Sequence, residues 1–129
     1  MEIGQKYSFK KSYGIEEVKK FSQLSDDKNP IHLDEEFAKK SIFGRRIIPG
    51  MLISSLFSGI IANHVPGPGS IYLQQDLKFK APIFLGEKFI VEVKIIDIRN
   101  DKPIYTLETT CYKENNEVAI SGTAIILKK

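Results

Sequence analysis

The sequence predicts an α+β fold in which an antiparallel sheet of about five strands wraps around one long buried helix. The segment from Gly50 to His64 is apolar nearly all round, relieved only by serine, glycine and a final polar pair, so a helix there must be enclosed. One extended segment precedes this helix and several strand-like segments follow it. Helices and strands in separate runs favour α+β over an alternating α/β fold.

The first half of the chain predicts one short strand and two short helices. Residues 5–13 are expected to be extended. Apolar residues then recur every three positions from Ile15 to Leu24, which is typical of an amphipathic helix of two to three turns. The polar run 25–30 ends this helix, because Pro30 disfavours the α region for the residue before it. Residues 34–40 begin with acids and end with lysines, as a short helix prefers.

The second half of the chain predicts the rest of the sheet. We expect strands at 71–80, 88–96, 103–113 and 117–127. Turn residues separate them at 100–103 and 114–116, and the doublet Ile95-Ile96 indicates a bulge. With the N-terminal strand, this makes a five-stranded sheet around one helix, the hot-dog arrangement, in a single domain over residues 1–129.

Composition and charge disfavour several classes of protein. The 19 basic and 16 acidic residues give a net charge of +3 and are spread along the chain, so no nucleic-acid partner is expected. The apolar helix is too short for a hydrocarbon core of about 30 Å, so no membrane partner is expected either. Cys111 is the only cysteine, and the chain has only two histidines. These are few ligands for a metal ion, so no metal site is expected. No apolar leader follows Met1, so we expect a cytoplasmic protein.

The loop from Asp27 to His32 is the most informative part of the sequence. It places a carboxylate and an imidazole in one polar turn that Pro30 makes rigid. Such a pair could hold a water molecule between a proton acceptor and a proton donor, as acid–base chemistry requires. From these residues alone an alternative stays open, in which Asp26 or Asp27 caps the following turn and His32 is a surface residue.

The pattern Asp27-x-Asn29-Pro30-x-His32 resembles the signature of the (R)-specific enoyl-CoA hydratases of the MaoC-like hot-dog family. The chain is also similar in size to the short bacterial members that supply (R)-3-hydroxyacyl-CoA for polyhydroxyalkanoate. The resemblance covers nearly the whole chain from about Phe21, and it continues through segments 32–34, 37–38, 49–52, 69–73 and 79–87.

This resemblance implies hydration of a trans-2-enoyl-CoA, with Asp27 and His32 as the catalytic pair. The backbone N–H of Gly50, at the start of the long helix, is the expected donor to the thioester oxygen. The expected substrate-binding residues are Asn29, which mainly shapes the loop, and Ser58 and Ile61, which line the end of a short acyl pocket. No cofactor is expected, because coenzyme A is part of the substrate. The resemblance further implies a homodimer with the acyl-CoA at its interface.

Two positions depart from the family pattern. Asp26 stands where glycine is usual, and it could raise the pKa of Asp27 if both carboxylates lay in the pocket. Pro49 stands where histidine is frequent, and proline suits a helix N-terminus.

Two other functions of the same fold stay open, a thioesterase and a non-catalytic acyl-CoA-binding module. Thioesterases and acyl-carrier-protein dehydratases of this fold commonly carry an acid on the central helix, and residues 50–63 contain none, which disfavours both. A binding module would have no need for both Asp27 and His32.

The remaining polar candidates are expected to be structural. His64 is expected at the C-terminal end of the long helix, where a positive charge on its ring would interact favourably with the helix dipole. Cys111 is expected to be an inert core thiol. Arg45 and Arg46 are expected to be solvated charges, with contact to a CoA phosphate as the less favoured interpretation.

Overall fold

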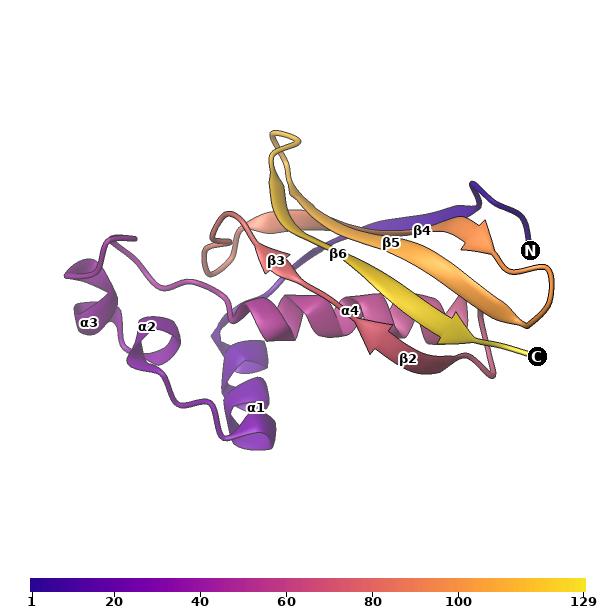
Figure 1. Cartoon of the computed structure of the whole chain (residues 1–129). Helices are drawn as coiled ribbons and strands as arrows, with labels where there is room; N and C mark the ends of the chain where they lie inside the picture. The colour runs from indigo at the N-terminus through magenta and orange to yellow at the C-terminus, as the bar shows by residue number, and fades with distance from the viewer.

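The long helix α4 (Gly50–Asn63) lies along one face of a single antiparallel sheet in the computed structural model, which describes residues 1–129 (Figure 1). The sheet has the order β1-β4-β5-β6-β2, and β3 pairs with β6 beside β2. Its strands are β1 (Lys6–Ser12), β2 (Ile71–Gln75), β3 (Lys78–Phe79), β4 (Lys88–Ile98), β5 (Ile104–Lys113) and β6 (Val118–Leu127). The predicted α+β hot-dog fold is therefore confirmed.

The first helices follow the sequence pattern, with one addition. Helix α1 (Ile15–Ser25) spans the predicted amphipathic segment, and α3 (Glu35–Lys39) is shorter than the predicted 34–40. Asp34 caps α3 by accepting a hydrogen bond from the N–H of Phe37. The addition is α2 (Pro30–Leu33), a single helical turn in the segment read from the sequence as a loop. That interpretation was wrong for residues 30–32, because Pro30 is favourable at the first position of a helix.

The sheet has six strands instead of five, because the predicted strand 71–80 breaks in the middle. At the break, the Asp76 carboxylate accepts from the N–H of Thr123, and the Asp76 N–H donates to the Thr123 carbonyl oxygen. The Gln75 amide donates to the carbonyl oxygen of Asp76. The predicted bulge is confirmed, since the β4–β5 register shifts after Ile95.

Gly122 lies directly under this break, and a Cβ there would overlap the carbonyl oxygen of Asp76. We expect Gly122→Ala to reduce the free energy of unfolding by about 1–3 kcal/mol, because a backbone group must move to admit the methyl group. Thermal melting measures the loss. Ser121→Ala, on the neighbouring residue of the same strand, is the control and should change stability by about 0.5 kcal/mol or less. Equal stability of Gly122→Ala and the parent would contradict this account.

Helix α4 is less enclosed than the sequence predicts. Its inner side packs on the sheet through Ile53, Phe57, Ile60 and Ile61, each at most 2% exposed. Its other side, which includes Met51, Ser55, Ser58 and Gly59, is exposed in the single chain. The expectation of a helix surrounded on all sides is therefore wrong for one chain, although the helix begins at Gly50 as predicted.

One row of side chains crosses the sheet toward α4 and ends beside it. Directly opposed residues of antiparallel strands share a face of the sheet. The row consists of Phe9, Val91, Cys111, Ile120 and Phe79, taken in order from β1 to β3. The middle three residues are at most 2% exposed, whereas Phe79 at the edge is 54% exposed. The register thus turns Phe79 toward the helix side of the sheet.

The segment that carries α2 and α3 leaves the sheet and returns just before α4 (Figure 1). Ile47 forms an isolated antiparallel bridge with Phe84, and the N–H of Ile48 donates to the carbonyl oxygen of Ile83 at 2.8 Å. These contacts tie the returning chain to the turn before β4. No helix of the structure is both long and apolar enough to cross a membrane.

Candidate active site

Asp27 is held in a turn at the end of α1. Asp26, the residue after the helix, has φ of 62° and ψ of 13°, the left-handed conformation that commonly ends helices. Glycine adopts it most easily and aspartate tolerates it, which explains how Asp26 can replace the usual glycine. One carboxylate oxygen of Asp27 accepts from the N–H of Asn29 at 3.1 Å. The other oxygen has no partner within the chain.

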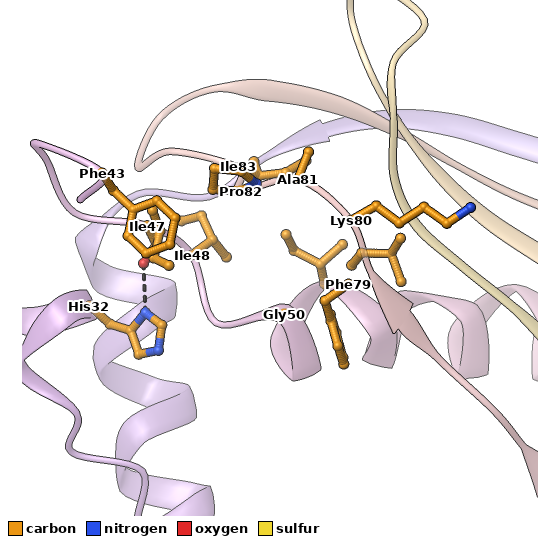
Figure 2. Close-up of a pocket in the computed structure, with 12 residues that line it drawn as sticks. His32, Phe43, Ile47, Ile48, Gly50, Phe79, Lys80, Ala81, Pro82 and Ile83 are labelled. Carbon is orange, nitrogen blue, oxygen red and sulfur yellow. Dashed lines mark hydrogen bonds between the residues drawn. The ribbon is translucent and has the colours of Figure 1, made fainter. Parts of the chain in front are cut away.

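His32 lies on α2, and the backbone around it fixes the direction of its ring. Asn29 begins this turn by accepting a hydrogen bond from the N–H of Ile31 at 3.2 Å. Nδ1 of His32 lies 2.7 Å from the carbonyl oxygen of Ile47 (Figure 2). Because a carbonyl oxygen only accepts, Nδ1 carries the proton in this contact. Nε2 of the neutral ring then presents a lone pair.

Gly50 begins α4, so its backbone N–H has no intrahelical acceptor, and no other group of the chain accepts from it. The ring of Phe79 packs against this glycine (Figure 2). A Cβ on Gly50 would lie 2.5 Å from two atoms of that ring. The start of α4 therefore offers a free donor beside an aromatic wall.

Two hollows meet at the first turn of α4. The His32 cavity, of about 270 Å³, is lined by His32, Gly50 and Phe79 and is otherwise mostly apolar. The Asp27 groove, of about 770 Å³, is more polar and lies along the next residues of the helix. Its lining includes Asp27, Met51, Ser54, Ser55, Ser58, Tyr72 and Leu77.

The predicted site residues divide between these hollows. His32 and Gly50 line the His32 cavity, and Asp27 and Ser58 line the Asp27 groove. No hydrogen bond joins Asp27 to His32 directly, and the two side chains line different hollows. Asn29 is exposed and lines neither of them.

Ile61 and Asp26 also lie outside both hollows. Ile61 is 2% exposed and belongs to the core. Since Asp26 lines neither hollow, a second carboxylate beside Asp27 in the pocket is not part of this site.

Sequence reasoning missed several polar residues of the Asp27 groove. The Tyr72 hydroxyl donates to Gln75 at 3.0 Å, and Gln75 in turn donates to the Thr109 hydroxyl at 3.0 Å. Burial raises the pKa of Tyr72 to about 12, so it stays a neutral donor near neutral pH. Ser54 donates to the carbonyl oxygen of Gly50 at 2.8 Å. The motif marked none of these residues, because they lie outside it, on α4 and β2, and only the fold brings them to the groove that Asp27 lines.

The other candidates have structural surroundings, as predicted. Cys111 is buried, and burial raises the pKa of its thiol to about 12, so it is not a nucleophile. His64 ends α4 and stacks on Tyr7 with ring centroids 3.8 Å apart. Arg46 pairs with Glu35 at 2.9 Å, and Arg45 lies over the ring of Phe84.

The model of one protein family matches most of the chain. The model of the MaoC like domain matches residues 1–117, and the chain belongs to this family.

Three comparisons show which known proteins the chain resembles. The chain is 45% identical to the (R)-specific enoyl-CoA hydratase of Aeromonas caviae, over 98% of this chain and 94% of that one. The solved structure of the (R)-hydratase from A. caviae involved in PHA biosynthesis superposes with a TM-score of 0.98 at 44% identity, covering 100% of this chain and 98% of that chain. A mitochondrial 3-hydroxyacyl-acyl-carrier-protein dehydratase of Solanum lycopersicum is 39% identical, over 96% of this chain and 75% of that protein.

Proposed function

We propose that this enzyme catalyses the (R)-specific hydration of trans-2-enoyl-CoA to (R)-3-hydroxyacyl-CoA, together with the reverse dehydration. The observation that carries the proposal is the arrangement at the start of α4. His32 lines one hollow together with Gly50, whose N–H is unpaired, and Asp27 lines a second hollow together with the next helix residue, Met51. The similarity to (R)-specific enoyl-CoA hydratases over nearly the whole chain supports the same reaction.

Asp27 and His32 would hold the reacting water between them. The free oxygen of the Asp27 carboxylate and the Nε2 lone pair of His32 are both acceptors for the water protons. The water oxygen bonds to C3 as the pair takes one of its protons, and the pair returns one proton to C2 on the same face. Water supplies both added groups, so no oxidant or reductant takes part. Because coupled groups share their titration, we assign acid–base catalysis to the pair and not to one member.

Gly50 would stabilise the charge that this addition creates. Attack at C3 moves negative charge onto the thioester oxygen, and a fixed N–H dipole lowers the energy of that charge. The N–H of Gly50 has no competing acceptor, and it stands at the positive end of the α4 dipole. Both features suit an oxyanion donor.

The reaction can be tested by mixing the protein with crotonyl-CoA. Loss of absorbance of the conjugated enoyl thioester, without release of free thiol, is the expected result. Release of free thiol would identify a thioesterase instead. Binding of crotonyl-CoA with neither change would identify a non-catalytic acyl-CoA-binding module.

Two carriers of the acyl group are candidates, coenzyme A and an acyl carrier protein. Relatives named for acyl-carrier-protein substrates are up to 39% identical to this chain, so the absence of an acid on α4 does not exclude that carrier. We propose coenzyme A, since the relative with higher identity is named for it. A lower kcat/KM for crotonyl-CoA than for the same acyl group on an acyl carrier protein would reverse this choice.

We propose a short acyl chain, of about four to six carbons, in the Asp27 groove. Ser54 and Ser58 line this groove, and Ile61 lies three residues after Ser58 and seven after Ser54, which makes it their neighbour along α4 at the edge of the buried side. Ile61 would close the far end, because it is large, buried and one turn beyond the last lining serine. Asn29 would act on substrate only through the turn that it caps.

We propose that two copies form a homodimer along β2. This strand is an edge of the sheet, and Ile71 and Leu73 on it are 56% and 53% exposed. Met51 on the open side of α4 is 58% exposed as well. Apolar side chains on an unpaired edge are a liability that a second copy would cover.

Light scattering is expected to give about twice the chain mass of 14.6 kDa. Ile71→Lys should shift the protein toward the monomer, because it buries a charge in the proposed contact. Ile42→Lys is the control, since Ile42 is 95% exposed and lies away from that edge, before α4. A fully active monomer at micromolar concentration would overturn the proposal.

Two further expectations from the sequence stay predictions. One is a cytoplasmic location, which the single reduced and buried Cys111 suits. The other is that no cofactor takes part beyond the coenzyme A of the substrate.

A further inference from the structure

We infer that Phe79 determines specificity at the acyl carbon next to the thioester, C2, by limiting the size of the group that fits beside Gly50. The inference rests on the proposed function, because it places the thioester at the N–H of Gly50. It concerns a residue outside the Asp27–His32 motif.

The sheet register directs Phe79 toward the catalytic end of α4. Phe79 pairs with Ile120 on β6, and Ile120 is 2% exposed on the side that faces the helix. Paired residues share a face of the sheet, so Phe79 extends the core row to the sheet edge. Core rows normally end in buried contacts, whereas this ring remains 54% exposed. Phe79 lies beside Gly50 and is one of the residues that line the His32 cavity (Figure 2).

The contact between the Phe79 ring and Gly50 leaves no room for even one carbon atom. A Cβ on Gly50 would lie 2.5 Å from Cδ1 and from Cε1 of the ring. Ordinary carbon–carbon contacts are about 3.5–4.0 Å. The ring is therefore in van der Waals contact with the residue whose N–H is the proposed donor.

The same ring stands where the substrate must pass between the two hollows. Gly50 and Phe79 line the His32 cavity, and their neighbours Met51 and Leu77 line the Asp27 groove. An acyl thioester that reaches both His32 and Asp27 must lie across this boundary. Its carbonyl oxygen would be at the N–H of Gly50, so C2 would be two bonds away from that oxygen and close to the ring.

A substituent on C2 would therefore compete with the ring for space. A straight enoyl chain carries only hydrogen at C2, whereas a 2-methyl chain adds one carbon group there. An extra methyl group in a fitted pocket commonly changes relative kcat/KM by about 10–200-fold. We expect the wild-type protein to prefer crotonyl-CoA over 2-methylcrotonyl-CoA, and Phe79 to account for much of that preference.

The test compares these two substrates in Phe79→Ala. The ratio of kcat/KM for 2-methylcrotonyl-CoA to that for crotonyl-CoA should rise by about tenfold or more relative to the wild type. Phe37→Ala is the matched control, because Phe37 is 50% exposed on α3 and lines neither the His32 cavity nor the Asp27 groove. Its ratio should stay that of the wild type. Phe79→Leu replaces Phe79→Ala if the alanine variant does not fold, and it should raise the ratio in the same direction.

A second measurement uses the contact with Gly50 itself. Gly50→Ala should lower crotonyl-CoA hydration, because its methyl group meets the ring. Removing the ring in Gly50→Ala/Phe79→Ala should restore part of that loss. An unchanged substrate ratio in Phe79→Ala and Phe79→Leu, with wild-type hydration of crotonyl-CoA present, would overturn this inference alone. A wild-type protein inactive on crotonyl-CoA would overturn the proposed function and this inference with it.

Discussion

His32→Gln and Asp27→Asn are each expected to lower the rate of crotonyl-CoA hydration by about 10²–10⁴, the usual size of a general acid–base contribution. Glutamine and asparagine amides retain hydrogen-bonding atoms of similar size, but they neither take up nor release a proton near neutral pH. Both side chains are partly or fully exposed, so the folded state should be retained. The measurement is the initial rate of absorbance loss, together with a thermal melt of each variant.

The chain offers a matched control for each substitution. His64→Gln makes the same change at the far end of α4, where His64 stacks on Tyr7. Asp26→Asn changes the neighbouring carboxylate, and asparagine also tolerates the left-handed backbone found there. Both controls should hydrate crotonyl-CoA at close to the parent rate. A folded Asp27→Asn/His32→Gln double variant with more than about a tenth of the parent rate would contradict the assignment.

Ile61→Ala is expected to have the largest effect on stability and to change the preferred acyl length. Ile61 is 2% exposed in the core, and such truncations cost about 2–5 kcal/mol of the free energy of unfolding. The lost side chain would open space beyond Ser58, at the proposed end of the Asp27 groove. Each additional buried methylene contributes about 0.8 kcal/mol to binding, so the turnover of octenoyl-CoA relative to crotonyl-CoA should rise.

Two measurements separate these effects. Thermal melting gives the stability loss, and the ratio of octenoyl-CoA to crotonyl-CoA turnover, taken well below the melting temperature, gives the specificity. Ile60→Ala is the control, because Ile60 is equally buried on α4 but lines neither the His32 cavity nor the Asp27 groove. It should lose stability without favouring the longer chain. If Ile61→Ala melts lower but keeps the parent ratio, Ile61 supports the core and does not close the groove.

The local sequence pattern predicts those features of the fold that depend on residues adjacent in the chain. Helix α4 begins where Pro49 and Gly50 predict, because proline is well suited to the start of a helix. The β4 bulge follows from Ile95-Ile96, since two adjacent apolar residues cannot both face the core of a regular strand. The break between β2 and β3 has no such local signal. It depends on Asp76 and Gln75 contacting residues more than thirty positions away.

The candidate site divides in the same way. The Asp27–His32 motif could be read from the sequence, because its residue types and spacing are specific. The contact that aims the His32 ring could not, since its acceptor is the main-chain carbonyl of Ile47 in an irregular segment. Phe79 falls within a segment that carries the family resemblance, but only the β3–β6 register brings it to Gly50.

The segment that carries Asp27 and His32, between Gln23 and Ile47, is expected to unfold locally at a lower free energy than the sheet. We call this segment the excursion. Between Gln23 and Ile47 only Ala38 is buried, whereas β4 alone buries four residues. Segments with few buried apolar contacts open at a small fraction of the free energy that unfolds a whole protein. Within one chain, α2 and α3 can therefore detach while the sheet stays paired, and the amide hydrogens of this excursion exchange with solvent first. We therefore expect rising temperature to abolish catalysis before it melts the sheet.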